Sequence, residues 1–232
     1  MTPCLIRQPA GIGDILFCQK IADKMRNKNY EIWWPIHDEI SWIKDHISNI
    51  NFCSINDNFP LKQYYYQSAP VKSDEGVFLP LQDADQYYTG MCMMDAKYKF
   101  IGLEYDDWSS YLKFSRNSNK EIDLIRNKLR LSGKFTLVNR KFGSPPNEQI
   151  CKHINTNNLS NVVELQSIPG VSLFDWCKVF EEAHEIHTVD TSILYILETL
   201  DITDKLYCYS RLSPPTFVNV SHLFSKDWTY VS

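Results

Sequence analysis

Short apolar runs alternate with amphipathic stretches along the whole chain. Residues 4–7 form an apolar run that predicts a strand, and the loop after it contains two glycines. Beyond this loop, apolar side chains recur every three or four residues, at Ile15, Cys18, Ala22 and Met25. This spacing predicts a helix. The chain therefore opens with a strand, a glycine loop and a helix.

The first half continues the alternation. Further strands are predicted at residues 31–36, 51–55 and 77–81, with a short helix at residues 40–47. Strands that alternate with helices predict a parallel sheet with right-handed crossovers. Residues 87–114 are rich in aromatic residues and methionine but have no clean period. We interpret this segment as packing rather than as a cofactor site.

The second half repeats the plan after a polar stretch at residues 117–119. The predicted strands are residues 134–139, 162–165, 185–189 and 205–209, and the predicted helices are residues 121–131, 172–183 and 190–200. We expect the aromatic tail to cross back to the first half. The fold class predicted is α/β, with two Rossmann-like halves, residues 1–116 and 117–232, whose parallel sheets face a cleft.

Composition fits this size and limits the function. The 232 residues, 44% hydrophobic and 13% aromatic, are enough for two small cores. A net charge of −4 without a basic run disfavours a nucleic-acid partner. Seven scattered cysteines without a CxxC pair predict a reducing, cytoplasmic location and no closed zinc site. No stretch reaches the roughly 20 apolar residues of a transmembrane segment.

Two segments resemble a known family. Residues 5–16 (LIRQPAGIGDIL) and residues 187–197 (HTVDTSILYIL) resemble the heptosyltransferase-like glycosyltransferases of the family 9 type. The resemblance implies a compact GT-B fold and transfer of a sugar from a nucleotide-sugar donor to an acceptor hydroxyl. Ser192 stands where heptosyltransferases often carry glycine, so the class of sugar stays open.

The glycine loop carries the candidate residues of the first half. In the resemblance, Asp14 matches a catalytic aspartate that acts as general base on the acceptor hydroxyl, a proton transfer that a carboxylate can perform. The alternative is an acidic residue that the helix dipole favours in a first turn. Gly11 and Gly13 allow a close approach of the backbone to a ligand, and we assign them to acceptor binding.

Asp83 and Asp85 form a DxD motif after the strand at residues 77–81. In the GT-A fold such a motif binds a divalent metal, because paired carboxylates are ligands for hard cations. Here it lies in the first half, whereas the donor features lie in the second. We therefore predict no metal and assign both residues to the acceptor.

The candidate donor residues follow strands of the second half, where open α/β sheets bind ligands. Asp190, Thr191 and Ser192 come after the strand at residues 185–189, and simple helix capping is the alternative. His187 in that strand is a further donor candidate. Arg140 and Lys141 could neutralise a diphosphate leaving group or be solvated. Glu164 loosely matches a family acid that contacts the donor's ribose.

These residues lead to one prediction and two alternatives. We predict a metal-independent glycosyltransferase that uses no cofactor beyond the nucleotide-sugar co-substrate. Its acceptor would be a glycan or another hydroxyl-bearing molecule, and Asp14 as base would fit inversion. The alternatives are an NAD(P)-dependent oxidoreductase that uses the glycine loop, and a non-catalytic nucleotide- or glycan-binding module on a GT-B frame.

Overall fold

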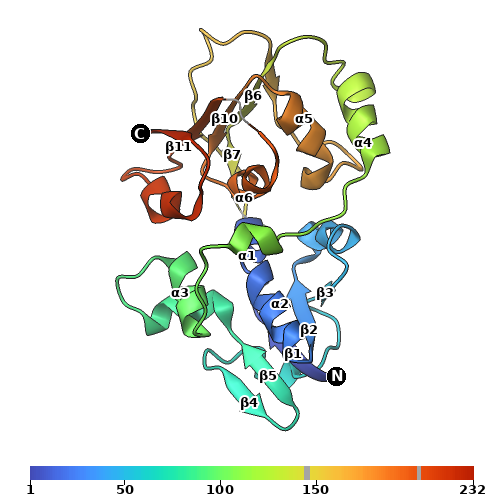
Figure 1. Cartoon of the computed structure of the whole chain (residues 1–232), viewed down its shortest axis with the longest axis vertical. Helices are drawn as coiled ribbons and strands as arrows, with labels where there is room; N and C mark the ends of the chain where they lie inside the picture. The colour runs from blue at the N-terminus through green and yellow to red at the C-terminus, as the bar shows by residue number, and fades with distance from the viewer. Residues whose placement is uncertain (144–146, 203–204) are drawn as a thin grey trace. The chain divides into compact units, whose positions relative to one another are not determined.

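The computed structural model describes residues 1–143, 147–202 and 205–232. Contacts divide the chain into two compact units, Met1–Phe114 and Ser115–Ser232, and each has its own central sheet (Figure 1). The predicted α/β class with parallel sheets is confirmed. No helix of the described residues is long and apolar enough to cross a membrane.

The N-terminal unit is built on a five-stranded sheet in the order β3-β2-β1-β5-β4. Its strands are β1 (Thr2–Ile6), β2 (Tyr30–Ile36), β3 (Asn51–Ser54), β4 (Val71–Ser73) and β5 (Gly76–Leu79). The pairs β1–β2, β2–β3 and β1–β5 are parallel, and the edge strand β4 pairs antiparallel with β5. The β4–β5 hairpin was not predicted from the sequence.

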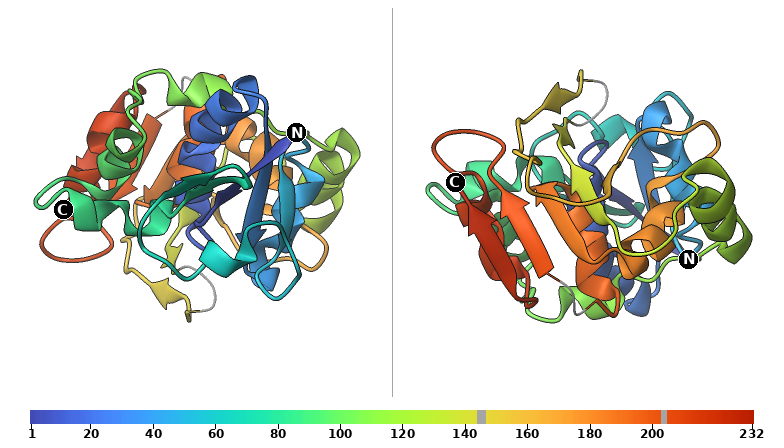
Figure 2. Two further views of the ribbon diagram at one scale, coloured as in Figure 1. Left: turned by 90° about the horizontal axis from the view of Figure 1, so that it is seen from below. Right: turned by 90° about the horizontal axis from the view of Figure 1, so that it is seen from above.

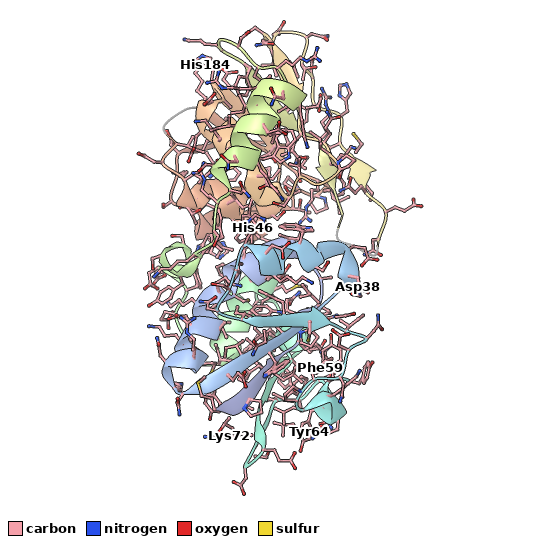
Figure 3. The ribbon with its side chains drawn as sticks, turned by 90° about the vertical axis from the view of Figure 1, so that its right-hand side faces the viewer. Asp38, His46, Phe59, Tyr64, Lys72 and His184 are labelled. Carbon is pink, nitrogen blue, oxygen red and sulfur yellow. The ribbon has the colours of Figure 1, made fainter. Side chains whose placement is uncertain are left out.

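One face of this sheet is covered by the connection between β3 and β4 and not by an α-helix. Leu5 of β1 and Phe78 of β5 pack against Phe59, Leu61 and Tyr65, which lie in the connection between β3 and β4. Figure 3 labels Phe59 on this connection. The only regular element of the connection is the short 3-10 helix η2 (Lys62–Tyr64).

The other face carries the helices. They are α1 (Ile12–Phe17), α2 (Gln19–Asn27) and α3 (Met93–Phe100), with 3-10 helices η1 (Asp38–Asp45), η3 (Leu81–Tyr87) and η4 (Trp108–Tyr111). Phe17 packs on Tyr98 and Trp108, with ring centroids 4.8 Å and 5.4 Å apart. Tyr98 and Trp108 of the aromatic segment are therefore core residues, as predicted, whereas Tyr87 and Met93 of the same segment are exposed.

The C-terminal unit has a wholly parallel sheet in the order β12-β11-β10-β6-β9. Its strands are β6 (Thr136–Asn139), β9 (Val162–Glu164), β10 (Glu185–Val189), β11 (Lys205–Tyr209) and β12 (Trp228–Val231). Strands β10, β11 and β12 lie side by side (Figure 2, right). The tail, which we expected to cross back, instead supplies β12 to the sheet of its own unit.

Connections of the C-terminal unit run over both faces of its sheet. The helices are α4 (Ser118–Asp123), α5 (Cys177–Glu182) and α6 (Ser192–Thr199), the π-helix η5 (Leu124–Lys128) and the 3-10 helices η6 (Leu173–Trp176), η7 (Phe217–Asn219) and η8 (Ser221–Leu223). The connection from β6 to β9 holds the hairpin β7 (Lys141–Phe142) and β8 (Ile150–Cys151). Its Phe142 and Ile154 pack on Val138 and Val189 of the sheet.

Two helix starts show how well local chemistry predicts structure. Ser172 and Asp175 form a capping box at the start of the helix predicted at residues 172–183, since each side chain accepts a hydrogen bond from the other residue's backbone N–H. The cap expected before α6 differs. Thr191 occupies the N-cap position but makes no side-chain capping hydrogen bond, and the Asp190 carboxylate bonds elsewhere.

Candidate functional site

The loop after β1 is held at each residue from Arg7 to Pro9. The carbonyl oxygens of these residues accept hydrogen bonds from the Gln82 N–H, the Trp34 indole and the His37 N–H, at 3.0, 2.9 and 3.0 Å. Strands β1, β2 and β5 all end near this loop, because parallel strands share one carboxyl edge. The loop is therefore a rigid platform at that edge.

Asp14 lies at the end of this platform, in the first turn of α1. Its carboxylate folds over Gly11, which has a φ of +77°, and a Cβ at Gly11 would lie 2.4 Å from Asp14 Oδ2 and would displace the carboxylate. Such a φ strongly favours glycine. The backbone conformation therefore favours glycine at position 11, and the Asp14 carboxylate keeps this position only while residue 11 has no side chain. Gly13 lies inside α1, one residue before Asp14.

A buried lysine contacts the same carboxylate. Lys97 Nζ, from α3, lies 3.2 Å from Asp14 Oδ1, and the Lys97 side chain is fully buried whereas that of Asp14 is 24% exposed. The ammonium also donates to Gln8 Oε1 at 2.6 Å and to the Leu81 carbonyl at 3.0 Å. Three acceptors therefore hold the ammonium beside Asp14.

The two aspartates of the DxD motif lie in η3 and differ in what they contact. Asp83 forms an ion pair with Arg7, and Arg7 also donates to the Tyr65 carbonyl at 2.7 Å. Both side chains of the pair are largely buried, while Asp85 is half-buried. The Asp83 carboxylate therefore already has a cationic partner. Acceptor contact by either residue stays a prediction.

In the C-terminal unit, Asp190 follows β10 and its side chain is fully buried. Its Oδ1 accepts hydrogen bonds from the Arg211 backbone N–H at 2.9 Å and from Arg211 Nε at 3.1 Å. Its Oδ2 is buried without a hydrogen-bond partner among the described residues. The carboxylate thus holds Arg211, the second residue after β11, at the carboxyl edge of the sheet.

Arg211 presents its guanidinium to solvent from this position. Its side chain is 39% exposed, and within residues 1–143, 147–202 and 205–232 neither Nη atom has a hydrogen-bond partner. A free pair of Nη donors on a fixed stem matches the paired oxygens of a phosphate. The adjoining loop is ordered by Thr216, whose hydroxyl accepts from the Arg211 N–H at 3.2 Å.

Thr191 lies beside this pair. Asn139, at the end of β6, donates to Thr188 Oγ1 at 3.0 Å and to Thr191 Oγ1 at 3.4 Å. These bonds tie the turn before α6 to the neighbouring strand. Thr191 and Ser192 are both half-buried, so the turn between β10 and α6 remains partly accessible.

The other predicted donor residues in this part of the unit are Arg140, Glu164 and Lys141, and the first two contact each other. Arg140 donates to Glu164 Oε1 at 2.9 Å, to the Ile154 carbonyl at 2.5 Å and to Thr156 Oγ1 at 3.1 Å. Arg140 and Glu164 are therefore partners of each other, and the Arg140 guanidinium is already bonded on all three nitrogens. Lys141, the next residue, is exposed.

His187 lies in the middle of β10 rather than at its carboxyl end. Its Nδ1 is 2.9 Å from the Tyr209 hydroxyl, and its ring stacks on Tyr207 with centroids 4.4 Å apart. Burial lowers the pKa of His187, against the opposing effect of the Glu185 carboxylate. Its described contacts are all with its own sheet. Donor contact by His187 remains a prediction.

Sequence reasoning missed two residues of this geometry. Arg211 could have been found, because it lies two residues after a strand that was predicted and the carboxyl ends of such strands carry ligand-binding residues. Lys97 had no signal, because it lies in the segment without a hydrophobic period. Only the fold shows that it reaches Asp14.

Two α/β units of this kind, each with a largely parallel sheet and polar residues at its carboxyl edge, match the GT-B type of fold. A solved structure supports that class: a family 9 glycosyl transferase from Veillonella parvula matches 99% of this chain and 86% of its own, with a TM-score of 0.57 and 8% identity. The E. coli heptosyltransferase WaaC is also similar, both with ADP (TM-score 0.48) and with ADP-2-deoxy-2-fluoro heptose (TM-score 0.46). Each WaaC match is 10% identical and covers all of this chain, with 91% and 93% of WaaC. No protein-family model and no curated protein matches the sequence.

Proposed function

We propose that this protein is a glycosyltransferase that moves a sugar from a nucleotide-sugar donor to an acceptor hydroxyl. The observation that carries the proposal is the fold shared with a family 9 glycosyl transferase over 99% of the chain. The residues at the two sheet edges support it, because one edge offers a carboxylate and the other a free guanidinium.

The C-terminal unit would bind the donor. Arg211 supplies the cation for the diphosphate, and Thr191 and Ser192 supply hydroxyls at the start of α6. An arginine fork pairs with phosphate through two parallel hydrogen bonds. The same positive charge would stabilise the nucleoside diphosphate as it leaves. Lys141 is a second candidate for this role, since its side chain is exposed.

The N-terminal unit would supply the base. The acceptor oxygen attacks the anomeric carbon, the bond from that carbon to the phosphate oxygen breaks, and the nucleoside diphosphate leaves with the electron pair. Asp14 accepts the acceptor's proton. A direct attack of this kind inverts the anomeric centre. We propose that no metal takes part, since the Asp83 carboxylate is paired with Arg7 and Arg211 can neutralise the diphosphate.

The test is a thermal-shift panel of UDP, GDP, ADP, CMP and dTDP with their sugars, plus NAD and NADP, with and without EDTA. Ligand binding to the folded state raises the melting temperature by mass action. A nucleotide-sugar that shifts the protein is then assayed for transfer, with water as the default acceptor and release of free sugar as the readout.

We expect one nucleotide series to shift the melting temperature regardless of EDTA, and Asp14→Asn to lower turnover about 10²–10⁴-fold. A shift that needs a divalent metal would contradict the metal-independent mechanism. A shift with NAD or NADP alone would favour an oxidoreductase. Binding without turnover in both wild type and Asp14→Asn would indicate a binding module.

A further inference from the structure

Lys97 is a charged residue in a place where packing alone would favour an apolar one. Its side chain is fully buried, and its neighbours in α3, Ala96 and Tyr98, are buried as well. Removing an ammonium from water is costly, and a buried ion pair is often no more stable than a well-packed hydrophobic replacement. Stability therefore does not explain a lysine at this position.

The contacts of Lys97 converge on the residue that the reaction uses. Its Nζ donates to Gln8 Oε1 and the Leu81 carbonyl and lies 3.2 Å from Asp14 Oδ1. Gln8 is itself fixed, since its Nε2 donates to the Ala10 carbonyl at 2.7 Å. The ammonium thus has little freedom to move, and neither does the carboxylate oxygen beside it.

The other side of the carboxylate is also defined. Asp14 Oδ2 lies over Gly11, so one oxygen faces the buried ammonium and the other faces the glycine of the loop. Because the side chain is 24% exposed, the carboxylate remains accessible to a ligand. Asp14 is therefore an accessible carboxylate whose orientation is fixed by a buried ammonium on its protein side.

We propose that Lys97 is a positioning residue, which holds the Asp14 carboxylate in the orientation needed to accept the acceptor's proton. This inference rests on the proposed function, since it assigns Lys97 a role only if Asp14 is the base. Lys97 does not touch the reacting atoms. It acts by fixing the rotamer of Asp14, and a misplacement of about 1 Å can cost about 10²-fold in rate.

The matched control is another buried lysine of the same unit. Lys20, in α2, is 6% exposed and pairs with Asp107 and the Glu104 carbonyl. Lys20→Met and Lys97→Met remove the same charge from the same unit, but only Lys97→Met removes a contact to Asp14. A general effect of losing a buried ammonium would appear in both variants.

The experiment measures kcat and KM for hydrolysis of the nucleotide-sugar that gives the largest thermal shift. Lys97→Met, Lys20→Met and Gln8→Glu are each made in the wild type and in Asp14→Asn. Gln8→Glu keeps the side-chain size and the lysine, but gives the ammonium a competing carboxylate. If circular dichroism shows that Lys97→Met does not fold, Gln8→Glu still tests whether Lys97 positions Asp14.

We expect Lys97→Met to lower kcat about 10–100-fold with little change in KM, and Gln8→Glu to lower kcat several-fold. Neither should lower kcat further in Asp14→Asn, because residues that act as a unit are not additive. Equal losses in both backgrounds, or an equal loss in Lys20→Met, would overturn the role of Lys97 and leave the proposed function standing. If wild type hydrolyses no nucleotide-sugar, the proposed function fails and this role fails with it.

Discussion

Arg211→Met tests the assignment of the donor site most directly, because it affects both stability and binding. The substitution removes the hydrogen bond from Arg211 Nε to Asp190 Oδ1 and leaves only the bond from the backbone N–H. The Asp190 side chain is fully buried. The variant therefore leaves a buried carboxylate with one remaining donor.

The size of the effect follows from that geometry. A hydrogen bond to a charged group contributes about 1.5–3 kcal/mol, and an uncompensated buried charge costs about 3–5 kcal/mol. Arg211 is 39% exposed, so water can replace part of the lost interaction and the lower range applies. We expect a loss of about 2 kcal/mol, or about 4–8 °C in melting temperature for a chain of this size.

Binding should fall as well. The free Nη donors would form paired hydrogen bonds with the diphosphate. Their loss should lower the affinity for the nucleoside diphosphate that stabilises wild type by about 10–100-fold. Calorimetric titration measures the affinity, at a temperature where the variant remains folded. Arg126→Met is the matched control, because Arg126 is an exposed arginine of the same unit.

Two results would refute this reasoning. If Arg211→Met melts within about 1 °C of wild type, the pair with Asp190 contributes nothing measurable. If it destabilises the protein but binds the nucleotide as tightly as Arg126→Met does, Arg211 is a structural residue and the diphosphate binds elsewhere, with Lys141 as the next candidate.

Three further predictions concern other parts of the chain. Gly11→Ala should lower kcat for nucleotide-sugar hydrolysis about tenfold or more, because a Cβ at a φ of +77° displaces the Asp14 carboxylate; unchanged kcat in steady-state assays would contradict this. Arg116→Met should destabilise the protein by about 3 kcal/mol in urea unfolding, because Glu121 is 2% exposed and accepts two hydrogen bonds from Arg116. Burial lowers the pKa of His187 from 6.5, so the unfolded chain binds the proton more readily and stability is lost as the pH falls below 6.5. His187→Gln should therefore show a smaller fall in melting temperature than wild type between about pH 7.5 and pH 5.

Much of the fold could be predicted from the sequence, because each predicted strand is an apolar run between loops. Strands β1, β2, β10 and β11 lie within a few residues of their predicted positions. Three peripheral strands could not be predicted in the same way. Strands β4, β8 and β12 are short, and at most one residue of each is buried, so their pairing depends on the neighbouring strand rather than on their own pattern.

The helices were predicted less accurately than the central strands. The single helix expected at residues 121–131 is an α-helix, Ser118–Asp123, followed by a π-helix, Leu124–Lys128. The short helix expected at residues 40–47 is a 3-10 helix, Asp38–Asp45. Apolar spacing is similar for these helix types, because all of them place residues three to five apart on one face. The spacing alone cannot distinguish them.

In the candidate site, too, residues marked by local sequence could be predicted and partners from distant segments could not. Motif and strand order led to Asp14, Asp190 and Thr191, which the structure places at the carboxyl edges of their sheets. Partners from distant segments could not be found this way: Lys97 lies in sequence far from Asp14. Arg140 is a second case, since its side chain bonds Glu164 and the β6–β9 connection, contacts that the sequence did not predict, while its donor contact stays a prediction.

Both units hold an accessible charged side chain with a buried partner of opposite charge. In the N-terminal unit the buried Lys97 holds Asp14, and in the C-terminal unit the buried Asp190 holds Arg211. Lys97 and Asp190 are fully buried, while the side chains of Asp14 and Arg211 are 24% and 39% exposed. Ion pairs buried in this way contribute little net stability, but they fix the orientation of the outer group. They lie at the carboxyl edges of the sheets, where α/β proteins bind ligands, and this is the position that the proposed roles of Asp14 and Arg211 require.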